Sequence, residues 1–395
     1  MIHEANRLKR LPPYLFTIID SLKREVKAQG TDIIDLGMGN PDQGAPDYIV
    51  EELCRAARMK STHRYSRFDD EVEQKLRQAI ANRYKDVFNV DLDPQTEVLP
   101  LIGSKEGIAH LSLSFLNNDD IALVPSPAYP VHFNGVIMAG GILYNIPLKK
   151  ENGFKPDLRS LGKEIVKMSK LLFLSYPHNP TAAVVDLGFF KEMVAWARSK
   201  DIIIGHDLAY SDIVFDGYKA PSILQVKGAK KMGIEFHTLS KSYNMAGWRI
   251  GYCVGNADIL KVLAKTKSYI DFGMFQAVQW AAIKALNGPQ DCVKQAVQMY
   301  QLRRDVLVDN LRKVGWDVER PKATFYVWAH IPLKYSALTS MEFTSFLLKE
   351  TGVVVAPGIG FGEYGEGYIR FALVEPEDRI KEAVNRIGKL LKIES

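Results

Sequence analysis

The most informative stretch of the sequence is Thr238-Leu-Ser-Lys241-Ser-Tyr-Asn-Met-Ala-Gly-Trp-Arg249-Ile-Gly251. Its lysine follows an apolar run at 236–240 that predicts a strand. Lys241 is therefore expected at the carboxyl edge of a sheet, where open α/β folds bind ligands. A lysine amine can form an imine with a carbonyl compound, while nearby hydroxyl groups and an arginine suit a phosphate. Taken alone, the stretch fits a surface lysine in a polar turn equally well.

Short apolar runs alternate with stretches of helical spacing through the middle of the chain. The runs lie at 98–102, 121–125, 171–175, 202–207, 236–240 and 250–254, and helical spacing is found at 104–116 and 187–200. Strands that alternate with helices predict an α/β fold with a mainly parallel sheet covered on both faces.

The pattern changes near residue 288. A long charged helix is predicted at 291–314, followed by an alternating run at 323–331, a helix at 339–351, short runs at 352–356 and 368–373, and a closing helix at 375–391. We therefore expect a large domain at 46–287 and a smaller α+β domain at 288–395. Residues 1–45 are too few for a domain and are expected to pack as an arm on the small one.

Three further segments place polar groups at the ends of predicted strands. Ser175-Tyr-Pro-His-Asn179-Pro180-Thr181 ends one strand with an amide, although an asparagine between prolines is also a common turn former. His206-Asp207-Leu-Ala-Tyr210 ends another with a carboxylate, which needs a partner if buried, or which simply caps a helix. Gly103-Ser104-Lys105-Glu106-Gly107 opens a helix whose N–H groups suit a phosphate, with a capping box at Ser104 as the alternative.

Composition narrows the classes of protein further. The 395 residues are 47% hydrophobic and 25% charged, as in a soluble globular protein of roughly two to three domains. The net charge of +5 comes without a run of like charge and gives no argument for nucleic acid. The three cysteines lack metal-ligand or disulfide spacing, and no stretch approaches the ~20 apolar residues of a membrane span. We expect a cytoplasmic protein with no metal site and no nucleic-acid or membrane partner.

Together these segments resemble the pyridoxal-phosphate aminotransferases of class I/II, which have the aspartate-aminotransferase fold (fold type I). The resemblance runs from Leu11 to the C-terminus and is carried by SKSYNMAGWRIG, YPHNPT, DLAY, GSKEG and PSPAYP. Within the family, LPPYLF, MGNPD, HDLAYSDIV, KAPSILQV and PGIGFG are similar to the bacterial glutamate–pyruvate (alanine) aminotransferase group, related to the LL-diaminopimelate aminotransferases. The resemblance implies a large domain with a mainly parallel seven-stranded sheet covered by helices, plus a smaller α+β domain.

The resemblance also implies a cofactor, pyridoxal 5′-phosphate, and residues that hold its ring. Lys241 would bind it covalently and later move the substrate proton. Asp207 would pair with the ring nitrogen and keep it protonated, which makes the ring an electron sink. Asn179 and Tyr210 would hydrogen-bond the ring hydroxyl, and Tyr129 would stack on the ring unless it is a plain core residue.

The same resemblance assigns the phosphate and the substrate. Arg370, in Tyr368-Ile-Arg370-Phe-Ala, would bind the substrate carboxylate bidentately, as its planar fork allows, unless it is a surface ion pair. Gly39 would lie beside that carboxylate, with Asn179 and Tyr14 on the substrate side. The phosphate would be bound by Ser104, Lys105, Thr238, Ser240 and Arg249, and by Tyr65 from the partner subunit.

The implied activity is a ping-pong exchange of an amino group between an amino acid and a 2-oxo acid by a homodimer with shared active sites. Alanine/pyruvate with glutamate/2-oxoglutarate is the expected pair, and aspartate, LL-diaminopimelate or aromatic amino acids are the alternatives. The loop at 67–76 departs from the family's glycine-centred turn and leaves the preference open. Two rivals are a carbon–sulfur lyase on the same fold and a non-catalytic amino-acid sensor.

Overall fold

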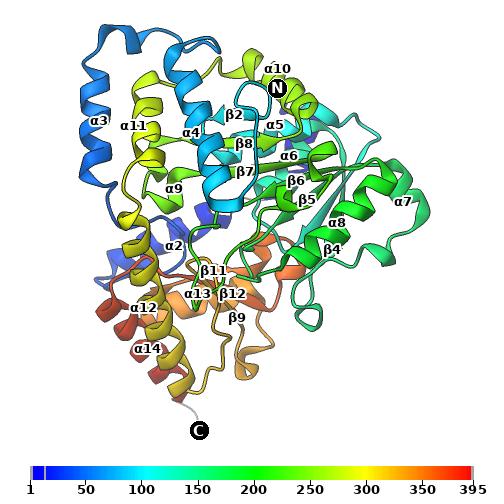
Figure 1. Ribbon diagram of the computed structural model, residues 1–395. Helices are drawn as coiled ribbons and strands as arrows, with labels where there is room; N and C mark the ends of the chain where they lie inside the picture. Colours follow the sequence, from blue (N-terminus) through cyan, green and yellow to red (C-terminus); the bar gives the residue numbers. More distant parts are fainter. Residues whose placement is uncertain (1–2, 13–14, 393–395) are drawn as a thin grey trace.

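A seven-stranded sheet forms the centre of the computed structural model, which describes residues 3–12 and 15–392 (Figure 1). The strand order is β2-β8-β7-β6-β5-β3-β4, and β8 alone runs antiparallel to its neighbours. The mainly parallel seven-stranded sheet expected from the sequence is therefore confirmed. Its strands are β2 (Val98–Leu101), β3 (Ile121–Ser126), β4 (Ile142–Pro147), β5 (Ser169–Ser175), β6 (Ile203–Asp207), β7 (Gly233–Thr238) and β8 (Gly251–Gly255).

Two of these strands differ from the sequence-based expectation. The short apolar runs identified in the sequence did not include β4, because this edge strand is mostly half-exposed and carries Asn145 within it. The run at 236–240 was predicted as strand throughout, but β7 ends at Thr238 and the one-turn helix α9 (Leu239–Ser242) follows. Lys241 therefore lies on a helical turn beyond the strand.

Helices cover both faces of the large sheet because its central strands are apolar on both sides. On β5, Leu171 and Phe173 face one layer, and Leu172 and Leu174 face the other. The first layer contains α5 (Ser104–Phe115), α6 (Val131–Ala139) and α10 (Ala257–Ile270). The second contains α3 (Asp47–Ala57), α4 (Glu71–Phe88), α7 (Lys163–Met168), α8 (Leu187–Lys200) and α11 (Gln276–Asn287).

The C-terminal part has a core and a sheet of its own. Strands β11 (Ala356–Pro357), β12 (Tyr368–Ala372) and β9 (Tyr326–His330) pair antiparallel in that order. Helices α12 (Asp291–Lys313) and α14 (Glu377–Lys392) lie side by side (Figure 1), and α13 (Ser340–Thr351) joins the same core. The predicted α+β character of this region is found here.

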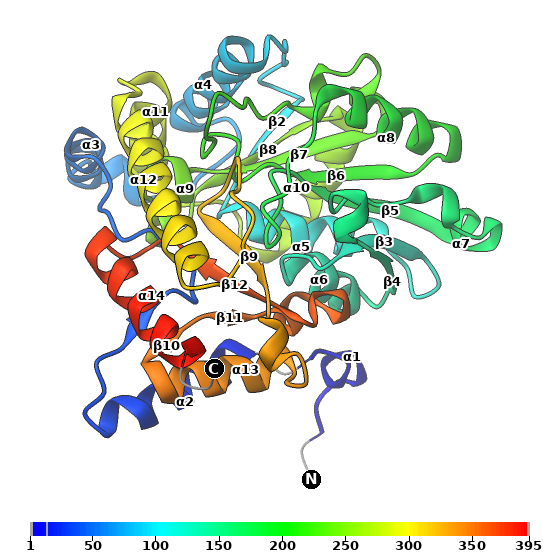
Figure 2. The same ribbon diagram turned by 90° about the horizontal axis from the view of Figure 1, so that it is seen from below.

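The N-terminal residues pack on this C-terminal part. After α1 (Asn6–Lys9), helix α2 (Leu15–Ala28) lies against α13 (Figure 2), and β1 (Ile34–Asp35) pairs in parallel with β10 (Val353–Val354). The division into 1–45, 46–287 and 288–395 stays a prediction. Across the described ranges, no helix combines the length and the apolar character that a membrane crossing requires.

The core of the C-terminal part gives a stability prediction. Leu307 on α12 is fully buried, whereas Leu302 on the same helix is 54% exposed. Leu307→Ala should lower the free energy of unfolding by about 2–5 kcal/mol, because it leaves a cavity. Leu302→Ala should stay within about 0.5 kcal/mol of the unmodified protein. Urea unfolding followed by circular dichroism measures both, and equal losses would contradict the packing of α12.

Candidate active site

A pocket of about 240 Å³ lies between the large sheet and the small sheet. It brings together every site residue expected from the sequence except Tyr65 and Tyr14. Its lining residues are Met38, Gly39, Ser104, Lys105, Tyr129, Asn179, Asp207, Ala209, Tyr210, Thr238, Ser240, Lys241, Ala246, Arg249, Tyr326, Phe361 and Arg370.

The topology of the large sheet explains why these residues meet. Strands β5, β6 and β7 are parallel, so their carboxyl ends reach the same edge, and Asp207 is the last residue of β6. Because β8 is antiparallel, its amino end lies at that edge too, and Gly251 pairs with Thr238 there. The polar groups at the ends of these strands are thus brought to one edge of the sheet, where open α/β folds bind ligands.

Lys241 has its amine inside the pocket. Its Nζ donates a hydrogen bond to the Gly39 carbonyl at 2.8 Å and lies 5.1 Å from the centre of the Phe325 ring. Burial, and then the positive charges of Arg370 and Arg249, lower the pKa of Lys241 to about 7, against the opposing effect of Asp207. Near neutral pH a large share of this amine is therefore unprotonated, as a nucleophile or proton acceptor requires.

The Asp207 carboxylate is buried at the end of β6. Its Oδ1 accepts a hydrogen bond from the Ala209 N–H at 3.2 Å, and its Oδ2 lies 3.4 Å from His132 Nε2. No helix begins at Asp207, so the alternative of a plain helix cap is wrong. His132 was not among the predicted residues, although it lies three residues after Tyr129 on the first turn of α6.

The start of α5 has the features of an anion site. Its N-cap is Gly103, with φ +81° and no side-chain cap, so the alternative of Ser104 as a capping residue is wrong. A Cβ at Gly103 would lie 2.5 Å from Arg249 Nη2, so glycine lets the guanidinium come close to the helix start. Free N–H groups of the first turn, a guanidinium and the Thr238 and Ser240 hydroxyls, 2.8 Å apart, together fit a phosphate.

Arg370 reaches the pocket from β12 and is 3% exposed. Its Nη1 donates to Asn179 Oδ1 at 2.8 Å and its Nη2 to the Gly37 carbonyl at 3.0 Å. The guanidinium carbon lies 3.9 Å and 4.6 Å from the ring centres of Tyr326 and Phe361. Within the described chain its buried Nε has no hydrogen-bond partner, so this donor of the planar guanidinium group is left for a carboxylate. The alternative of a surface ion pair is wrong.

Tyr326 and Phe361 were not predicted as site residues: the segment of Tyr326 matches no motif, and Phe361, although it lies within PGIGFG, was given no role. Tyr326 lies 3.0 Å from Tyr210, hydroxyl to hydroxyl, and burial raises the pKa of Tyr210 well above its usual value. Tyr326 also explains Gly39, where a Cβ would lie 1.9 Å from the Tyr326 hydroxyl oxygen. This wall of the pocket therefore joins Gly39, Tyr210 and Tyr326, which lie far apart in the sequence.

Two expected residues are not in the pocket. Tyr65 is 82% exposed, its ring 5.5 Å from that of Phe272 in an edge-on arrangement, and it does not line the pocket of its own chain. Tyr14 lies outside the described residues.

This fold and this set of side chains define a class. A buried amine, a carboxylate, an anion-binding helix start and an arginine fork fit a phosphorylated carbonyl cofactor with a basic ring nitrogen, and an amino-acid carboxylate beside it. The class is that of the fold type I enzymes, which hold pyridoxal phosphate on a lysine.

Comparisons with known proteins are more specific. Residues 31–387 match the family model "Aminotransferase class I and II". The chain is 48% identical over 390 residues (99% of both chains) to an LL-diaminopimelate aminotransferase of Moorella thermoacetica. It is 49% identical over 386 residues (98% of this chain, 93% of the relative) to the glutamate–pyruvate aminotransferase AlaC of Escherichia coli. The substrate-bound BacF structure from Bacillus subtilis superposes with a TM-score of 0.93 at 38% identity, covering 99% of this chain and 98% of that one.

The chain belongs to the class I and II aminotransferases. It is a transaminase that depends on pyridoxal 5′-phosphate and has the fold of aspartate aminotransferase. The fold, the enzyme class and the cofactor expected from the sequence are thereby confirmed.

The lowered pKa of Lys241 gives a prediction about cofactor capture. The rate at which cofactor-free enzyme takes up pyridoxal phosphate should rise about tenfold per pH unit and level off near pH 7, because only the neutral amine attacks. Stopped-flow absorbance measures this rate. Dividing it by the rate at which a simple amine reacts with pyridoxal phosphate at the same pH removes the effect of ionisation of the cofactor itself. Lys241→Ala should not form the absorption band of the cofactor that is covalently bound to the lysine. A rate that climbs until about pH 10 would mean an ordinary lysine.

Proposed function

We propose that the enzyme moves an amino group between alanine and 2-oxoglutarate, giving pyruvate and glutamate, in a reversible two-step exchange. The wall beside Arg370 carries the proposal. Tyr326 and Phe361 flank the guanidinium, and Met38 lines the same pocket. The methyl group of alanine would meet aromatic rings and the Met38 side chain there, and it needs no hydrogen-bond partner of its own. The name of the Escherichia coli relative supports the same pair.

LL-diaminopimelate is a second candidate donor. It is favoured by the name of the Moorella thermoacetica relative, which matches this chain over almost its whole length. Both donors present the same α-amino and α-carboxylate groups to Arg370. They differ at the far end of the side chain, where diaminopimelate carries a second pair of charged groups.

The proposed roles of the residues follow from their contacts. When bound, pyridoxal phosphate supplies an aldehyde that takes up the amine and a ring that withdraws electrons. Arg370 binds the substrate α-carboxylate with its fork. Asn179 accepts a hydrogen bond from Arg370 Nη1 through its Oδ1, which leaves the Asn179 amide N–H groups for the cofactor. Lys241 Nζ takes the proton from the substrate Cα, since its lowered pKa leaves it unprotonated near neutral pH.

Two further groups support this proton transfer. Asp207 would pair with the cofactor ring nitrogen and keep its positive charge, and the His132 ring lies beside the carboxylate, with Nε2 3.4 Å away. Because that charge would favour loss of the Cα proton more than binding of the substrate, Asp207 would act on the rate rather than on substrate binding. Tyr210, kept protonated by burial, donates a hydrogen bond to the ring hydroxyl group.

We also propose a homodimer with shared sites, located in the cytoplasm. Tyr65 supports the dimer, because it is 82% exposed yet its segment matches the one that the family directs to a phosphate. Exposed apolar side chains occur in its own segment and in the segment that contacts it: Phe68, Ile270, Phe272 and Phe275. A patch of this kind typically marks an interface. The three cysteines, all free, suit a reducing compartment.

A donor panel tests the substrate proposal. With 2-oxoglutarate as acceptor, kcat/KM for L-alanine should exceed that for LL-diaminopimelate, L-aspartate and L-phenylalanine. Phe361→Ala should lower kcat/KM for alanine by raising KM, since it loosens the Arg370 fork. Coupled assays for pyruvate and glutamate measure these values.

If the enzyme turns over LL-diaminopimelate efficiently and does not turn over alanine, the assignment moves to the second candidate donor. Pyruvate released from cysteine without any 2-oxo acid would favour a lyase.

Subunit mixing tests the shared site. A Lys241→Ala chain has a dead site but an intact Tyr65, and a Tyr65→Phe chain has an intact Lys241. In a mixed dimer one site should combine both intact residues, so activity at limiting cofactor should rise above that of either parent. Tyr269, 84% exposed, provides a matched control, because Tyr269→Phe should leave the Kd for the cofactor unchanged. A fully active monomer, or a mixture no better than its parents, would rule out the exchange of Tyr65.

A further inference from the structure

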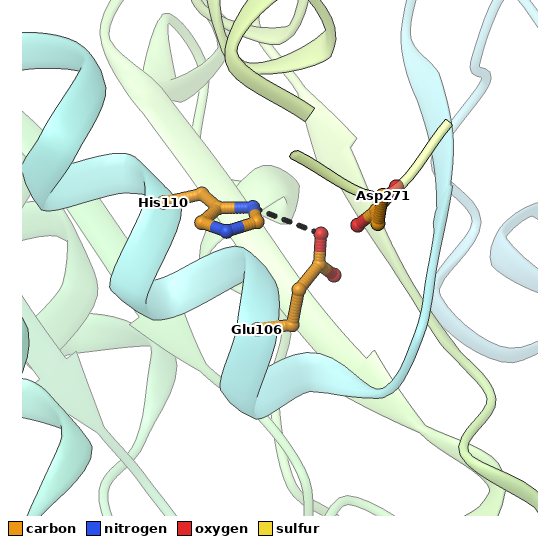
Figure 3. Close-up of side chains that lie close together, drawn as sticks. All are labelled: Glu106, His110 and Asp271. Atoms are coloured by element: carbon orange, nitrogen blue, oxygen red, sulfur yellow. Dashed lines mark ion pairs between the residues drawn. The ribbon is translucent and has the colours of Figure 1, made fainter. Parts of the chain in front are cut away.

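A cluster of charged side chains lies outside the pocket, where α5 packs against α10. Glu106 and His110 project from α5, and Asp271 follows α10 (Figure 3). His110 Nδ1 lies 3.0 Å from Glu106 Oε1, and the three ligand-type side chains are close enough to one another to suggest a metal site.

Lys267 supplies the positive charge that such a cluster needs. Its Nζ lies 3.2 Å from Glu106 Oε1 and 2.9 Å and 2.8 Å from the two Asp271 oxygens, and the side chain is 7% exposed. An ammonium group bonded to both carboxylates takes the place where a metal cation would bind. The cluster is therefore an ion bridge within the chain, from α5 to the end of α10.

One end of this bridge is next to the phosphate-binding turn. Glu106 is the third residue of α5 and follows Ser104 and Lys105 directly. An unpaired carboxylate at this place would repel a phosphate bound at the helix start, which carries close to two negative charges. The ammonium group of Lys267 offsets that repulsion and holds the first turn of α5 against α10.

The other end of the bridge is next to the segment that carries Tyr65. Asp271 Oδ1 accepts a hydrogen bond from the Gly273 N–H at 3.1 Å, which fixes the turn after α10. Phe272, with φ +57°, packs its ring on Tyr65, and a Cβ at Gly273 would lie 3.2 Å from the Ser66 carbonyl oxygen. The turn and the Tyr65 segment are thus in direct contact.

We propose that Lys267 is a positioning residue for the phosphate end of the cofactor. Through Glu106 it neutralises and orients the first turn of α5. Through Asp271 it places the turn after α10, which carries Phe272, against Tyr65. The inference rests on the proposed phosphate roles of Ser104, Lys105 and Tyr65. Lys267 lines no part of the pocket and touches no reacting atom. We therefore expect a substitution of Lys267 to change the contribution of the phosphate group to cofactor affinity and to leave the contribution of the rest of the cofactor unchanged.

Comparing pyridoxal phosphate with pyridoxal, which lacks the phosphate, separates this role from a general structural one. In cofactor-free enzyme, Lys267→Met should raise the Kd for pyridoxal phosphate about tenfold, while the Kd for pyridoxal stays within about twofold. Lys267→Arg should restore most of the affinity, because its fork reaches both carboxylates. Lys294→Met removes an exposed lysine that pairs with Asp291 at 3.1 Å, and it should change neither value. Equal weakening for both ligands, or none, would overturn the proposal.

A charge-compensating variant keeps the test valid if Lys267→Met folds poorly. Glu106→Gln removes the repelling carboxylate, so the double variant Glu106→Gln/Lys267→Met should recover much of the phosphate-dependent affinity. A double variant that binds pyridoxal phosphate no better than Lys267→Met would overturn the charge argument. Arg249→Ala tests the underlying site separately: if it leaves the preference for pyridoxal phosphate over pyridoxal unchanged, the phosphate assignment itself fails, whatever Lys267 does.

Discussion

The buried guanidinium of Arg370 is where the N-terminal arm, the large sheet and the small sheet meet. Its hydrogen bonds go to the Gly37 carbonyl on the arm and to Asn179 beyond β5, while Tyr326 and Phe361 lie against it. A buried charge is costly unless it is paired and hydrogen-bonded, so these partners hold the three parts in one arrangement. Under the proposed roles, substrate recognition and cofactor contact would be coupled, because the Asn179 amide that accepts a hydrogen bond from Arg370 also lines the pocket.

Charge balance around Lys241 follows from the same arrangement. Two guanidinium groups, Arg370 and Arg249, act on its amine together with burial, and Asp207 only partly opposes them. The pocket is thus prepared for ligands that bring negative charge, namely a phosphate and a carboxylate. As these anions bind, they offset the charges of the two arginines, and the Lys241 amine then holds a proton more readily. Both conditions suit the proposed role of Lys241, in which the amine first attacks and later accepts a proton.

Several alternatives that the sequence left open depended on one or two residues of local geometry. Ser104 and Asp207 both occur where a helix cap is common, yet the cap of α5 is Gly103 and no helix begins at Asp207. Local sequence could not decide these cases, because a cap and a ligand group use the same residue types at the same places. At the start of α5, the guanidinium of Arg249 lies against Gly103, a contact that the local sequence around Ser104 does not show.

The sequence by itself determined the alternation of strands and helices, the mainly parallel sheet and the polar residues at its carboxyl edge. These features depend on short-range patterns of apolar residues, which are visible in any one segment. Tertiary structure decided which side chains lie beside the predicted ones: Tyr326 and Phe361 around Arg370, His132 beside Asp207, and, outside the pocket, Lys267 between Glu106 and Asp271. Three of these contacts, Tyr326–Arg370, His132–Asp207 and Lys267–Glu106, join residues tens to hundreds of positions apart. Local periodicity carries no information about them, because they arise only when strands and helices pack together.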